Sequence, residues 1–122
     1  MHYRITIRSA RLAQIEQLEE NVREFGPEAV SEFVRCMTQT IEQASRAFDS
    51  DSPAQLRLLL AREFQSAALD VHDEARATAH MLSIILLESA LDHFVSQPSR
   101  NDLLLRCLRI IEMAKRCAPT LH

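Results

Sequence analysis

The stretch from Ala54 to Gln97 constrains the fold most, because it contains neither glycine nor proline. The whole chain of 122 residues has one glycine and four prolines. Since these residues most often form tight turns, a turn-rich β fold is disfavoured. Apolar residues make up 47% of the chain and charged residues 25%, which is the balance of a globular protein of one domain. The sequence therefore predicts a single all-α domain over residues 1–122.

Apolar residues recur every three or four positions from Ser9 onward, which is the spacing of one helical face. The first such stripe comprises Leu12, Ile15, Leu18, Val22 and Phe25, and the second comprises Val30, Phe33, Val34, Met37, Ile41, Ala44 and Phe48. Gly26 predicts a left-handed end to the first helix, and Pro27 suits the first turn of the next. Residues 1–8 lack the helical period, so we expect an extended or frayed lead-in there.

Capping residues predict the remaining helix boundaries. Ser52 is a capping residue with Gln55 three positions later, which completes a capping box. One helix over the whole glycine-free stretch would be unusually long, so we expect a break at Asp70, which would cap the next helix with Asp73 at its third position. Ser99 is expected to cap the last helix. The sequence thus predicts an up-down four-helix bundle with an additional N-terminal helix, about five helices in all.

Charge and cysteine content narrow the class of protein. The net charge of -3 gives no support for nucleic-acid binding, which needs a basic excess. The first residues lack the apolar core of a signal peptide, and the longest apolar run is too short to span a bilayer. The three cysteines form no Cys-x-x-Cys pair, which is typical of a reduced protein. We therefore expect a cytoplasmic protein with neither a membrane nor a nucleic acid as partner.

The histidines give no sign of metal or catalytic chemistry. His72 and His80 are eight residues apart, which is ~12 Å along a helix axis and too far to bind one metal ion together. A single glycine excludes the glycine-rich loops that bind phosphates. No cysteine has a histidine or basic residue at a spacing that would activate it. We expect a protein without metal or cofactor that is not an enzyme.

A second apolar stripe runs beside the first on the helix after Asp70. It comprises Met81, Ile84, Leu87 and Leu91. A helix that is apolar nearly all round lies either at the centre of a bundle or against a partner. These four residues are therefore a candidate dimer or partner face, and one alternative function is a homodimeric structural or chaperone-like bundle.

The order and spacing of the helices resemble those of the histidine-phosphotransfer (Hpt) domain. The resemblance covers residues 9–117, and the segment FGPEAVSEFVRCMTQTIEQASRAFDSDSPAQLRLLLAREFQSAALDVHDEA looks like the two central helices of that family. The family signature, Ala-His-x-Leu-Lys-Gly, aligns with Ala61-Arg62-Glu63-Phe64-Gln65-Ser66, so Arg62 occupies the position of the phospho-accepting histidine. The resemblance implies a bundle that docks on other signalling proteins but lacks the acceptor histidine at the usual place.

Three functions follow from these observations. The leading hypothesis is a non-enzymatic protein-interaction module, an adaptor or antagonist in two-component signalling whose partner is a receiver domain or another signalling protein. Arg57, Arg62 and Gln65 would form its docking face. The second hypothesis is the homodimeric bundle described above. The third is phosphotransfer through His72 or His80, since Ala79-His80-Met81-Leu82 is similar to the start of the family signature.

Overall fold

The computed structural model describes residues 2–95 and 100–117, which form five α-helices without a strand. The helices are α1 (His2–Arg23), α2 (Pro27–Asp49), α3 (Pro53–Leu69), α4 (Glu74–Val95) and α5 (Arg100–Cys117). The prediction of an all-α bundle with about five helices is confirmed.

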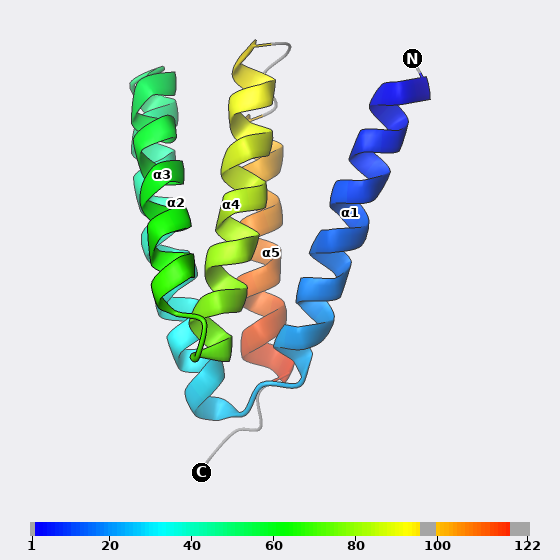
Figure 1. Ribbon diagram of the computed structural model, residues 1–122, viewed down its shortest axis with the longest axis vertical. Helices are drawn as coiled ribbons and strands as arrows, with labels where there is room; N and C mark the ends of the chain where they lie inside the picture. The colour runs from blue at the N-terminus through cyan, green and yellow to red at the C-terminus, as the bar shows by residue number, and fades with distance from the viewer. Residues whose placement is uncertain (1, 96–99, 118–122) are drawn as a thin grey trace.

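Helices α2 to α5 form the up-down four-helix bundle, in which each helix contacts the next and α5 returns to α2 (Figure 1). The additional helix α1 packs against α4 and α5 and leans away from the bundle toward its N-terminal end. α3 lies at the opposite edge, where it contacts only α2 and α4 among the helices with substantial contacts. α4 is central and contacts all four other helices. No described helix has an apolar stretch long enough to cross a membrane.

The boundary between α2 and α3 follows the sequence prediction. The Ser52 hydroxyl accepts a hydrogen bond of 3.3 Å from the Gln55 backbone N–H, and Pro53 occupies the first turn. The Gln55 side chain does not close the reciprocal half of the capping box, because its Oε1 accepts from the Ser50 hydroxyl instead. Ser52 is therefore a true N-cap that satisfies one of the free donors of the first turn.

Two predictions at the start of the chain are wrong. Helix α1 begins at His2, so the lead-in predicted to be extended or frayed is helical. Gly26 has φ -76° and ψ 176°, which is extended backbone, and it serves as the N-cap of α2 rather than as a left-handed end of α1. Pro27 does occupy the first turn of α2, as predicted.

The break in the glycine-free stretch lies where it was expected, but with different capping. Asp70 ends α3, and its backbone N–H donates to the Ser66 carbonyl at 2.9 Å. Asp73 caps the start of α4, since its Oδ1 accepts a hydrogen bond of 3.1 Å from the Arg76 backbone N–H. Asp70 was therefore wrongly predicted as the N-cap, and its carboxylate is left for other contacts. The cap predicted at Ser99 lies outside the described residues.

The core is divided between the two ends of the bundle. The larger cluster joins α1, α2, α4 and α5 and contains Ile15, Val22, Phe33, Met37, Leu82, Ile110 and Ala114 among others. The smaller cluster joins α2, α3 and α4 and comprises Ala44, Ala47, Phe48, Leu56, Leu59, Leu87 and Ala90. α4 contributes to both clusters, which explains why it is apolar nearly all round.

The second stripe of α4 is mostly core. Ile84 and Leu87 are buried within the chain, and Leu91 is half-buried against the smaller cluster. Only Met81 is exposed. Because its central members face other helices of the same bundle, this stripe does not form an exposed dimer face, which corrects the expectation drawn from its composition.

Candidate functional site

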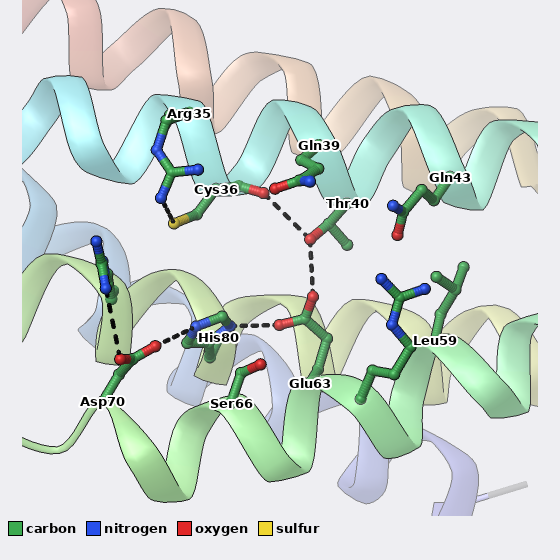
Figure 2. A pocket seen from close by; sticks show the side chains of 12 residues that line it. Arg35, Cys36, Gln39, Thr40, Gln43, Leu59, Glu63, Ser66, Asp70 and His80 are labelled. Carbon is green, nitrogen blue, oxygen red and sulfur yellow. Dashed lines mark hydrogen bonds and ion pairs between the residues drawn. The ribbon is translucent and has the colours of Figure 1, made fainter.

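A polar cleft lies where α2, α3 and α4 meet (Figure 2). Its volume is about 230 Å³. Its lining comprises Arg35, Cys36, Gln39, Thr40, Gln43, Leu59, Arg62, Glu63, Ser66, Asp70, Arg76 and His80. All but Leu59 carry a hydrogen-bonding or thiol group, which is unusual between helices that otherwise pack through apolar side chains.

His80 of α4 lies between two carboxylates, those of Glu63 in α3 and of Asp70 directly after α3. Its Nδ1 contacts Glu63, and its Nε2 is 3.0 Å from the Asp70 Oδ2. The three side chains are 12%, 16% and 24% exposed for His80, Glu63 and Asp70. Each ring nitrogen therefore faces a carboxylate oxygen at hydrogen-bonding distance.

The network continues from this centre to α2 and to the start of α4. The Thr40 hydroxyl donates to Glu63 at 3.0 Å across the cleft, as Figure 2 shows. On the other side, the Arg76 guanidinium lies 3.7 Å from Asp70 and donates to Glu32 of α2 at 2.8 Å. Polar contacts therefore join three helices at the end of the bundle where the smaller apolar cluster does not reach.

Two arginines fix the charge of Glu32. The Arg35 guanidinium, and after it that of Arg76, hold the pKa of the Glu32 carboxyl at about 2, below its ordinary value of 4.5. Cys36 lies beside this pair, 3.7 Å from Arg35, and burial raises the pKa of its thiol. Burial also raises the pKa of the Cys107 thiol to about 12. Neither thiol is therefore activated as a nucleophile.

The predicted docking residues of α3 lie on its solvent-facing side. Arg57, Arg62 and Gln65 are all exposed, and Arg62 also lines the cleft. Within the described part of the chain, no hydrogen bond or ion pair is found for the side chain of Arg57 or Arg62. By contrast, Glu63 points inward to His80. The exposed charges of α3 are thus exclusively positive, in a chain whose net charge is -3.

The same side of α3 exposes several large apolar residues. Leu58, Phe64 and Leu69 are 66%, 53% and 81% exposed, and Val71 in the following turn is also exposed. Four of the eight large apolar side chains exposed in the described residues therefore lie on this helix and its C-terminal turn. We call the exposed residues of the helix from Arg57 onward the α3 outer face. It comprises Arg57, Leu58, Ala61, Arg62, Phe64, Gln65, Ala68 and Leu69.

The histidines predicted as phosphate acceptors are placed differently from each other. His72 is exposed in the turn between α3 and α4. His80 is largely enclosed, with both ring nitrogens facing carboxylates. No group of three or more histidine, cysteine or carboxylate side chains among the described residues has the arrangement of a metal site.

The sequence reasoning missed the acidic partners of His80. A signal for one of them was present, because Glu63 follows Leu56 and Leu59 at helical spacing and so lies on the inward stripe of its helix. A carboxylate on such a stripe requires a buried partner. The sequence does not identify that partner, since Glu63 and His80 lie on separate helices.

Comparison with protein-family models, with functionally characterised proteins and with solved structures finds no match.

Proposed function

We propose that this bundle acts by binding another protein through the α3 outer face. The observation that carries the proposal is the combination of exposed Leu58, Phe64 and Leu69 with Arg57 and Arg62 on one helix at the edge of the bundle. Exposed apolar groups that are concentrated on one face mark interaction sites in soluble proteins. Aliphatic and aromatic anchors beside arginines are also typical of protein interfaces.

The positive charge of the α3 outer face indicates which kind of partner protein fits it. A surface that presents only positive charge fits a partner on which apolar side chains are flanked by carboxylates. A second copy of this chain fits poorly, because a two-fold pairing of this face would bring the arginines of both copies together. The Hpt-like order of the helices leads us to propose a receiver domain, with its acidic pocket, as the partner, and an adaptor or antagonist role in signalling.

Binding rather than phosphotransfer is proposed because of the surroundings of His80. An imidazole accepts a phosphoryl group through a ring nitrogen that has a free lone pair and room for the incoming group. Both nitrogens of His80 face carboxylate oxygens, and the ring is 12% exposed.

Photo-crosslinking in the native host tests the proposed face. A benzoylphenylalanine replacing Gln65 on the α3 outer face should capture a partner, whereas the same group replacing Glu88 on α4 should not. Calorimetry with the captured partner should then show that Leu58→Asp or Arg57→Glu weakens binding by about tenfold or more. Crosslinks of equal yield from both positions, or unchanged affinity in both variants, would refute the proposal. Sedimentation of the purified chain detects self-association, the competing outcome.

A further inference from the structure

The polar cleft has hydrogen-bonding capacity that the protein itself does not use. Its floor is satisfied, because Glu63 contacts His80 and Thr40 and because Asp70 contacts His80 and Arg76. Its rim is different. Within the described residues, no hydrogen bond or ion pair is found for four of the side chains that line the rim from α2 and α3, which are Gln39, Gln43, Arg62 and Ser66. These side chains are free to bind a ligand.

The charges around the cleft favour an anion. Three arginines line it against two carboxylates, and both carboxylates already have cationic or hydrogen-bonding partners. Arg35 is neutralised in part by Glu32, whereas Arg62 has no acidic partner within the described residues. Guanidinium and amide groups together offer several N–H donors, which suit the oxygens of a carboxylate or phosphate.

The size of the cleft limits the ligand. A volume of about 230 Å³ lies below the ~300–1,000 Å³ of sites for drug-sized molecules. The rim is solvent-exposed at Arg35, Gln39 and Arg62, so a small ion can enter without movement of the helices. We propose that the cleft binds a compact oxyanion, a phosphate or carboxylate group, which is held by Arg62 with the amides of Gln39 and Gln43. This site goes beyond the proposed protein-binding function and does not depend on it.

Side-chain NMR of the full chain tests this site. The Nε–H signals of the arginines and the amide signals of the glutamines are followed as inorganic phosphate or acetate is added, with sodium chloride at matched ionic strength as the control for screening. We expect saturable shifts at Arg62 and Gln43 with a Kd of about 1 mM for at least one of the two anions. Whichever anion saturates the site identifies the phosphate or carboxylate class.

Two matched arginine variants separate a specific site from general attraction of anions. Arg62→Gln should weaken binding by about tenfold, whereas Arg57→Gln, on the same helix but outside the cleft, should weaken it less than about twofold. Shifts no larger than those with chloride, or equal weakening in both variants, would overturn the proposal. Leu58→Asp should leave anion binding intact while it disrupts the protein docking proposed above, so failure of one proposal is distinguishable from failure of the other.

Discussion

Removal of the His80 imidazole should destabilise the bundle much more than removal of a surface histidine. A hydrogen bond to a charged group contributes about 1.5–3 kcal/mol, and His80 makes two such contacts in a largely enclosed site. Partial exposure of Asp70 reduces the sum. We expect His80→Ala to lower the free energy of unfolding by about 3 kcal/mol, because the largely enclosed carboxylates of Glu63 and Asp70 would each lose a hydrogen-bond partner.

Urea unfolding followed by circular dichroism measures this loss, and a double-mutant cycle assigns it. His80→Ala, Glu63→Ala and the double variant should give a coupling energy of about 1–3 kcal/mol. The matched control is His72→Ala in the exposed turn, which should change stability by less than about 0.5 kcal/mol. A coupling energy within about 0.3 kcal/mol of zero would refute the argument that the two side chains stabilise one another.

Three further predictions test other parts of the fold. The pKa of Glu32 is lowered from 4.5 to about 2, so the stability that its ion pairs contribute is complete above pH 4.5 and is lost as the pH falls toward 2. In Glu32→Gln, the free energy of unfolding should therefore fall by about 1 kcal/mol less over that pH range, after allowance for solvent screening. An unchanged dependence of stability on acid pH would count against the ion pairs. Leu82 is fully buried, so Leu82→Ala should lower the free energy of unfolding, measured in urea, by about 2–5 kcal/mol. Leu58→Ala on the exposed face should lower it by less than about 0.5 kcal/mol, and equal losses would contradict the assignment of core and surface. Gly26 is an N-cap in extended backbone with open space around it. Gly26→Ser should therefore add a side-chain cap and raise the melting temperature by a few degrees. A lower melting temperature would show that the glycine is needed there.

The helices could be predicted because their signals are local. Apolar spacing identified the four-helix bundle, and Ser52 followed by Pro53 located a helix start that the structure reproduces. The N-cap residue was harder to predict where two nearby residues could both cap the same helix. Asp70 and Asp73 are both good caps, and the choice between them depends on which carboxylate is drawn into tertiary contacts. Gly26 was misplaced because an extended conformation suits glycine as well as a left-handed one does.

The polar cleft could not be predicted, because it depends on the rotation of three helices about their axes. Glu63 lies at helical spacing from the inward leucines of its helix, and His80 lies beside an apolar stripe, yet this spacing cannot show that the two residues meet. Thr40 gave no signal either, since a threonine on an apolar helical face is common. By contrast, the exposure of Arg57 and Arg62 was predictable, because both lie opposite the inward leucines of the same helix.

The central position of α4 determines in which order the helices can unfold locally. Since α4 contacts every other helix, it can lose its amide protection only when the rest of the bundle separates. Helix α1, whose substantial contacts are with α4 and α5, can detach while the four-helix bundle stays closed. Hydrogen exchange should therefore be slowest in α4 and faster in α1, so that the chain opens from its edges in separate steps rather than in one.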